Sequence, residues 1–340
     1  MPSKASLSSD LKGTSATSRS FILFMLGVLV GRLPRLFDSE FYRTTSGNYC
    51  SENQVVSKTV APPKSTNNST VCDDSNENNK SWWDYVAPLI FPLDGDGMID
   101  FPATVTSVVI DVGARDSDYL NDYFMTDKTT ALILVDPIPE SFVPLLSRVA
   151  AVAQKNSRAD LLDPRWKNKV MVTRVAMSDE EGVLPFNVAP NPSCGSLLKT
   201  KADNPFWCHA TVSTIQTVVL RLDRVLKLMP QRIQQLNLKV DAEGADLRVL
   251  MGAGDMLRQF DTVIIECVAP NVSWSTREGE CRTEVAVEYM ASKGFNHWIE
   301  KQGRSQVNIM FTPHDRSVTL PWTLQHPNME FSAFYKRLWN

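Results

Sequence analysis

The chain has 340 residues, a formal net charge of −3 and a hydrophobic fraction of 43%. This length is enough for one sizeable α/β domain with appendages and barely enough for two small domains. A charge so close to neutral gives no basic surface for nucleic acid and no acidic solvating tail, so we expect no nucleic-acid partner.

The N-terminus is unlike a folded domain. Residues 1–20 form a tail rich in Ser and Thr, and an unbroken apolar run follows from Phe21 to Gly31. This run is shorter than the roughly 20 residues that a helix needs to cross a bilayer, but it extends to Phe37 if the intervening arginines snorkel. We predict an uncleaved signal-anchor at residues 21–37. A cleaved signal peptide, an organelle transit peptide and a buried core helix are the alternatives.

The segment after the anchor, residues 38–80, is polar and lacks apolar periodicity, which predicts a flexible, disordered stem. N-glycosylation sequons, three of them in the stem, begin at Asn67, Asn68, Asn79 and Asn271. The six cysteines permit disulfides in an oxidising lumen, with free buried thiols as the alternative, and their spacing matches no zinc pattern. We therefore expect no metal site. We also predict a single-pass membrane protein of the secretory or endomembrane system with a luminal folded domain, although arginines on both sides of the anchor specify its orientation only weakly.

Strands and helices alternate through residues 81–313, which we predict to be one folded domain. Runs rich in β-branched residues predict strands at 105–113, 131–136, 169–177, 236–244, 261–267 and 306–311, with a short extended piece at 215–220. Amphipathic spacing predicts helices that begin at Ser141, span 222–228, stop at 252–254 and end at Gly294. This alternation is typical of an α/β fold with a mostly parallel seven-stranded sheet and helices on both faces. The aromatic tail, residues 314–340, is expected to pack back on the domain.

Carboxylates stand at four of the predicted strand ends: Asp111, Asp136, Asp241 with Glu243, and Glu266. Ligands of doubly wound sheets bind at the carboxyl ends of the strands, so these acids indicate a site. Helix caps and solvated loop acids are the alternative interpretation. Gly113 lets the backbone approach a ligand closely, and Asp136 follows it at about the 20-residue spacing of an acid that binds ribose hydroxyls. A complete G-x-G-x-x-G is missing, which disfavours a dinucleotide.

Seven sequence blocks carry a resemblance to a known family. They are VVIDVGARDSD, LVDPIPESF, VAMSDEEGVLPF, CGSLL, VVLRLDRVL, LKVDAEGADLRVLMGAGDML and VIIEC, in that order. Together they resemble the FkbM family of S-adenosylmethionine-dependent methyltransferases over about Val105 to Gln306. The resemblance implies a Rossmann-like class I methyltransferase fold, S-adenosylmethionine as cofactor, and O-methylation of a hydroxyl on a glycan or another small molecule.

The resemblance also implies roles for individual positions. The first cofactor loop corresponds to Asp111, Gly113 and Ala114, and the ribose position to Asp136 and Pro137. The segment that borders the adenine corresponds to Ala176 and Met177. The family's D-x-E-G, beside the methyl-transfer centre, corresponds to Asp241, Glu243 and Gly244.

The first loop departs from the family pattern, because Arg115-Asp116-Ser117 stands where the family has Asn, any residue and Gly. Arg115 either pairs with the cofactor carboxylate or blocks the pocket by its bulk. For catalysis, Glu243 is our first candidate for the base that takes the hydroxyl proton. Asp241 is expected to contact the cofactor or orient Glu243, and His209 ranks third. The alternative for Glu243 is an acid in the first turn of the following helix.

Two other functions remain open. One is a binding-only relative that keeps the fold and has lost turnover, which the altered first loop would explain. The other is a luminal glycosyltransferase that uses Asp94-Gly95-Asp96 as a metal-binding D-x-D. The acceptor is expected to meet the loop from Pro190 to Thr211 and the region after Cys267, where Trp207 and Trp274 could stack on a sugar ring or simply pack.

Overall fold

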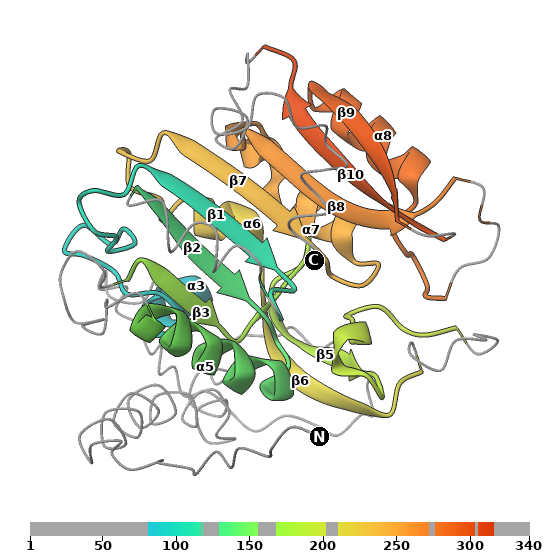
Figure 1. Cartoon of the computed structure of the whole chain (residues 1–340), viewed down its shortest axis with the longest axis horizontal. Helices are drawn as coiled ribbons and strands as arrows, with labels where there is room; N and C mark the ends of the chain where they lie inside the picture. Colours follow the sequence, from blue (N-terminus) through green and yellow to red (C-terminus); the bar gives the residue numbers. More distant parts are fainter. Residues whose placement is uncertain are drawn as a thin grey trace, which may run out of the picture. The chain divides into compact units, whose positions relative to one another are not determined.

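The computed structural model describes residues 81–115, 117, 129–155, 168–201, 210–270, 272, 276–302 and 305–315 (Figure 1). The chain divides into two units, Met1–Ile90 and Phe91–Asn340. In the first unit the described element is the helix α3 (Trp82–Ile90). Within the described ranges, no helix combines the length and the apolar character of a membrane span. The predicted anchor, stem and C-terminal tail fall outside these ranges and stay predictions.

The second unit is built on a seven-stranded sheet in the order β3-β2-β1-β7-β8-β10-β9. Its strands are β1 (Ser107–Val112), β2 (Thr130–Val135), β3 (Val170–Thr173), β7 (Gln235–Val240), β8 (Thr262–Val268), β9 (Phe295–Gln302) and β10 (Gln306–Pro313). β1, β2, β3, β7 and β8 are paired in parallel, and β10 runs antiparallel to both β8 and β9. The predicted Rossmann-like, mostly parallel seven-stranded sheet is confirmed.

Helices cover both faces of this sheet, because its central strands are apolar on both sides. Every residue of β1 and β2 is buried. The helix α5 (Pro139–Lys155) contributes Leu145 to a core with Val109, Leu132 and Leu134. The chain moves from β1 to β2 and β3 in one direction and from β7 to β8 in the other. Right-handed crossovers therefore put α5 on one face and α7 (Asp246–Ala253) on the opposite face.

Two further helices complete the layers. They are α6 (Leu222–Leu226), which precedes β7, and α8 (Thr283–Ser292), which lies between β8 and β9. Two 3₁₀ helices also occur, η2 (Pro192–Cys194) and η4 (Gly254–Gln259). The predicted stop of α7 at 252–254 is confirmed, since the helix ends at Ala253.

The predicted strand at 169–177 is wrong as a single element. The chain leaves the main sheet after β3, and Ala176–Met177 form β4 in a second sheet of order β4-β6-β5. Its other strands are β5 (Gly182–Val188) and β6 (Ser213–Leu220). Ala176, Phe186 and Val219 share a small core with Ile138, which closes this sheet against the start of α5. Tertiary packing therefore divides one apolar run between two sheets.

The start of α5 also differs from the prediction at Ser141. The helix begins at Pro139, and the Ser141 backbone N–H donates to the Ile138 carbonyl oxygen at 3.1 Å inside the first turn. The side chain that satisfies a free amide here is Asp136, whose Oδ1 accepts from the Ile138 N–H at 2.9 Å. This bond fixes a residue of the predicted site against the helix that follows it.

Candidate functional site

A cavity of about 410 Å³ lies at the carboxyl ends of β1, β2 and β7. Because β1 lies between β2 and β7, this is where the strand order reverses direction. Ten of the residues predicted from the sequence to bind cofactor or to act in catalysis line it: Asp111, Gly113, Ala114, Arg115, Asp136, Pro137, Ala176, Met177, Asp241 and Glu243. The structure thus brings these positions together, while their individual roles stay predictions.

A buried lysine that the sequence analysis missed organises the acids of this cavity. The Lys239 Nζ lies 3.4 Å from Asp111 Oδ1 and 3.3 Å from Asp241 Oδ2. Burial disfavours the ammonium group, but the two carboxylates outweigh burial and raise the pKa of Lys239. The only sequence signal was a charged residue inside an apolar strand. In β7, Lys239 pairs in register with Asp111 and stands two residues before Asp241, so alternation puts all three on one face.

Asp111 and Asp136 are almost fully buried, with 1% and 4% of their surface exposed. Burial raises the pKa of Asp111, although Lys239 opposes this shift. Burial also raises the pKa of Asp136 to about 6, against the hydrogen bond from Ile138. Within the described residues, Asp111 Oδ1 accepts no hydrogen bond. This buried oxygen therefore forms an ion pair with Lys239 but no hydrogen bond to a described residue. Asp111 also lines the cavity.

Glu243 stands in the left-handed region, with φ of 52°, in the loop between β7 and α7. Burial and the neighbouring Asp241 raise its pKa to about 8. The alternative that it is a first-turn acid of α7 is wrong, because that acid is Asp246. The Asp246 carboxylate accepts from the backbone N–H groups of Gly244 at 3.1 Å and Ala242 at 3.4 Å. The loop that presents Glu243 is thus shaped by a buried side chain below it.

The opposite wall of the cavity comes from the small sheet and the CGSLL block. Ala176, Met177 and Phe186 give it an apolar surface, and Ser193 and Gly195 line it from η2 and the residue that follows. A Cβ at Gly195 would lie 2.8 Å from both Ile138 Cδ1 and Phe186 Cε1, so glycine is what allows this close packing. The expectation that the loop after Pro190 reaches the site holds for its described part. His209, Trp207 and Trp274 fall outside the described residues.

Two expectations about the first loop need correction or refinement. Gly113 has φ of +78°, and a Cβ there would lie 1.9 Å from the Asp241 backbone oxygen. The close approach of the loop after β1 to the loop after β7 therefore requires a glycine here, and Gly113 also lines the cavity, so its predicted contact with a cofactor stays a prediction. Arg115 is exposed and lines the cavity without filling it. Its bulk does not block the pocket.

Glu266 does not line the cavity, although it lies at a predicted strand end. Burial and the nearby Asp241 raise its pKa to about 9, so it belongs to the same electrostatic cluster. The Asp94-Gly95-Asp96 tripeptide forms a turn in which Asp94 Oδ1 accepts from the N–H groups of Asp96 at 3.0 Å and Met98 at 2.9 Å. In the described part of the chain, no cluster of three or more His, Cys, Asp or Glu side chains could hold a metal ion. These observations do not favour a metal-dependent D-x-D.

The sequence matches the model of the methyltransferase FkbM domain over residues 111–298, more than half of the chain. The chain belongs to the FkbM methyltransferase family. The resemblance is confirmed, and with it S-adenosylmethionine as the cofactor. The matched range includes the carboxylates of the cavity, Lys239 and the whole D-x-E-G loop. A search of curated proteins finds no match to the chain.

Among solved structures, the FkbM chain is similar to three methyltransferases at low identity. Precorrin-6y C5,15-methyltransferase from Geobacter metallireducens GS-15 is 11% identical, with a TM-score of 0.29, over 63% of this chain and 83% of that one. The antibiotic-resistance methyltransferase Kmr is 12% identical, with a TM-score of 0.31, over 62% and 89%. Magnesium protoporphyrin IX methyltransferase from Synechocystis PCC 6803, solved with bound SAM, is 10% identical, with a TM-score of 0.27, over 68% and 77%.

Proposed function

We propose that this methyltransferase transfers a methyl group from S-adenosylmethionine to a hydroxyl oxygen of a glycan or another small molecule. The observation that carries the proposal is the cavity at the carboxyl ends of β1, β2 and β7, where four carboxylates and one buried lysine meet an apolar wall. Family membership supports methyl transfer, and the arrangement of the acids supports a hydroxyl as the acceptor.

The lining of the cavity fits the methyl donor group by group. Asp111 Oδ1, buried and without a hydrogen bond from the described residues, can accept from the donor's amino group. Asp136 stands after β2, where a carboxylate can accept from both ribose hydroxyls. Ala176 and Met177 offer an apolar surface to the adenine. Asp241 brings negative charge to one side of the cavity, which favours a sulfonium cation.

The mechanism that we propose depends on alignment and on one proton acceptor. When bound, S-adenosylmethionine supplies an electrophilic methyl group on its sulfonium sulfur. The cavity walls would hold the acceptor oxygen in line with that group. This alignment makes a bimolecular reaction effectively unimolecular. Glu243 would take the hydroxyl proton as the new C–O bond forms and the C–S bond breaks. A pKa raised to about 8 suits this role, because it makes the carboxylate a stronger base.

The test starts with donor binding, since it needs no knowledge of the acceptor. Calorimetry on the full chain should detect both S-adenosylmethionine and S-adenosylhomocysteine. Asp136→Asn should weaken binding roughly 10- to 100-fold, as expected for hydrogen bonds to a charged group worth ~1.5–3 kcal/mol. Glu243→Gln should bind the donor as well as the wild type does. No heat with either ligand for the wild type would refute the proposal.

Transfer is then measured with a labelled methyl donor against a panel of glycans and small hydroxylated molecules. Label should reach an oxygen of one acceptor class and should depend on Glu243. Donor binding without transfer to any of them would favour the binding-only relative, which Arg115 in the first loop motivates. A labelled nitrogen or carbon atom would contradict a hydroxyl acceptor while leaving methyl transfer intact. RNA belongs in the same panel, because the expectation of no nucleic-acid partner stays a prediction.

We also propose that the domain works in an oxidising lumen, behind the signal-anchor predicted at residues 21–37. A disulfide between Cys267 and Cys281 supports this location, and Cys194 is disulfide-bonded as well. Expression in mammalian cells, followed by membrane fractionation, protease protection and treatment with a glycosidase, tests it. A cytosolic, unglycosylated product with free thiols would contradict this location.

A further inference from the structure

A short segment, residues 276–281, lies against the loop that presents Glu243. The Cys281 backbone N–H donates to the Gly244 carbonyl oxygen at 2.8 Å. A Cβ at Gly244 would lie 3.2 Å from Glu280 Cγ and 3.6 Å from Arg277 Cδ. The side chains of Glu280 and Arg277 therefore occupy the space next to Gly244, the residue that immediately follows Glu243.

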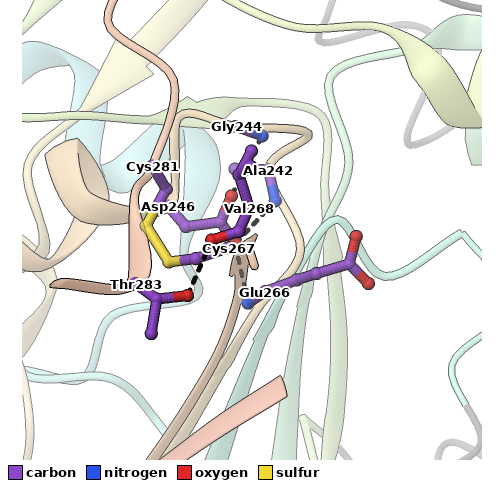
Figure 2. Close-up of a disulfide and its surroundings, with 8 residues drawn as sticks. All are labelled: Ala242, Gly244, Asp246, Glu266, Cys267, Val268, Cys281 and Thr283. Atoms are coloured by element: carbon purple, nitrogen blue, oxygen red, sulfur yellow. Dashed lines mark hydrogen bonds between the residues drawn. A yellow bond between two sulfur atoms is a disulfide. The ribbon is translucent and has the colours of Figure 1, made fainter. Parts of the chain in front are cut away.

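The disulfide ties this segment to the central sheet. Cys267, in β8, is bonded to Cys281 just before α8, and both are buried. Figure 2 shows that the disulfide stands beside Asp246, whose carboxylate bonds the loop, while the Glu266 side chain points away from the sulfur atoms. The Val268 backbone N–H donates to the Cys281 carbonyl oxygen at 2.9 Å, and the Thr283 hydroxyl donates to the Val268 carbonyl oxygen at 2.7 Å. The segment is thus held by a covalent bond and by several hydrogen bonds.

The other side of this segment is hydrogen-bonded to residues 199–201, which follow the cavity-lining Leu197 in the chain. The Lys201 N–H donates to the Thr276 carbonyl oxygen at 3.0 Å, and the Glu278 N–H donates to the Lys199 carbonyl oxygen at 3.0 Å. Arg277 lies between these two bonds. Only 1% of its surface is exposed, and its guanidinium donates to the Cys194 carbonyl oxygen. A buried cation is costly unless nearby groups compensate for its lost hydration.

We infer that Arg277 is a positioning residue for methyl transfer, whose guanidinium, carried to the D-x-E-G loop by the disulfide-bonded segment, favours the ionised form of Glu243 in the donor cavity. This inference rests on the proposed role of Glu243 as the proton acceptor. Arg277 does not line the cavity, so it acts through Glu243 rather than on a ligand.

Among the charged groups around Glu243, Arg277 is the cation that we expect to favour its ionised form. The charged groups that interact electrostatically with Glu243 are Asp241, Arg277, Asp246, Lys239 and Glu266. Three of these five are acids, and Lys239 already contacts two carboxylates, Asp111 and Asp241. The second acid near Arg277 is Glu280, which accepts from the Thr276 N–H at 2.7 Å and from the Arg277 N–H at 3.2 Å. Removing the guanidinium would leave Lys239 as the other cation among three acids and would disfavour the charged form of Glu243.

The experiment measures the ionisation of Glu243 directly, without donor or acceptor. The full chain is labelled with [5-¹³C]glutamate, and the Glu243 carboxyl signal is assigned by its loss in Glu243→Gln. NMR spectra recorded over a range of pH then give the midpoint of the Glu243 titration. Arg277→Gln should raise the midpoint by ~1–3 pH units, the size of shift that a nearby opposite charge produces. Arg277→Lys keeps the charge and should stay much closer to the wild type.

Two further variants separate this role from a merely structural one. Arg282→Gln is the matched control, because Arg282 also donates to a backbone carbonyl, that of Val272, but is not among the charged groups that shift the pKa of Glu243. It should leave the midpoint unchanged. Cys267→Ala with Cys281→Ala keeps Arg277 but releases its segment, and it should raise the midpoint even if Arg277→Gln does not fold.

An unchanged midpoint in Arg277→Gln, or equal shifts in Arg277→Gln and Arg277→Lys, would overturn the inference. A loss of thermal stability without a shift of the midpoint would also overturn it, since that is what a purely structural arginine would cause. Failure of the proposed function would be seen elsewhere, as a wild-type chain that gives no heat with S-adenosylmethionine in calorimetry. The two results are therefore distinguishable.

Discussion

Replacing Gly113 with alanine would test how closely the loop after β1 packs against the loop after β7. Alanine in the left-handed region, at φ of +78°, costs ~1–2 kcal/mol. The new Cβ would lie 1.9 Å from the Asp241 backbone oxygen, so the two loops must also separate. Forcing an extra methyl group into a packed site typically costs ~1–3 kcal/mol. We therefore expect Gly113→Ala to lose about 2–5 kcal/mol of the free energy of unfolding.

Gly97→Ala is a matched control for this change. Gly97 has nearly the same φ, +77°, but a Cβ there would meet no atom within 4 Å. It should lose only the conformational cost of ~1–2 kcal/mol. Urea unfolding of both variants gives the two free energies, and thermal unfolding should show roughly 2–4 °C lost per kcal/mol. Calorimetry with S-adenosylhomocysteine should show weaker binding for Gly113→Ala alone, because only this change displaces Asp241.

Equal losses of stability in the two variants would refute the argument from close packing. Unchanged donor affinity in Gly113→Ala, together with a large loss of stability, would show that Asp241 does not depend on the contact with this glycine. In that case the donor would be held mainly by residues of β1 and β2.

Three other predictions follow from the packing and charge of the site. Gly252→Ala should lower the melting temperature although alanine favours helices, because its Cβ would lie 2.2 Å from the Ser178 backbone oxygen; an unchanged value would contradict this. Glu243→Gln should reduce turnover ~10²- to 10⁴-fold. Wild-type turnover should rise with pH around 8, where Glu243 ionises. A turnover rate that does not change with pH would exclude Glu243 as the base. Since burial raises the pKa of Glu266 to about 9, ionisation opposes folding, and stability should fall as pH rises from about 4.5 to 9. Glu266→Gln should reduce this change of the free energy of unfolding with pH, measured by urea unfolding. A change with pH equal to that of the wild type would show that Glu266 does not cause it.

Much of the fold follows from local sequence. The runs of β1, β2, β7 and β8 are rich in Val, Ile and Leu, which is typical of strands covered on both faces. Their carboxyl ends carry the acids, so the edge of the sheet that binds a ligand could be predicted before any contact was known. The D-x-E-G block then pointed to the family.

Other elements were missed because their residues lack a distinctive pattern. The edge strand β9 exposes Trp298 and Ile299, at 47% and 44%, so neither of its faces has the apolar alternation of a half-buried strand. The run at 169–177 looks continuous in sequence, and only packing against Phe186 and Val219 moves its last residues into the small sheet.

The site itself combines both kinds of information. Local sequence is enough to identify the carboxylates at strand ends, because strand identity and alternation are local properties. The contacts of Lys239 with Asp111 and Asp241, the bond between Cys267 and Cys281, and the burial of Arg277 beside the D-x-E-G loop follow from the folded structure alone. These are contacts between segments far apart in the chain. They depend on strand order and on the paths of loops, which no short stretch of residues encodes.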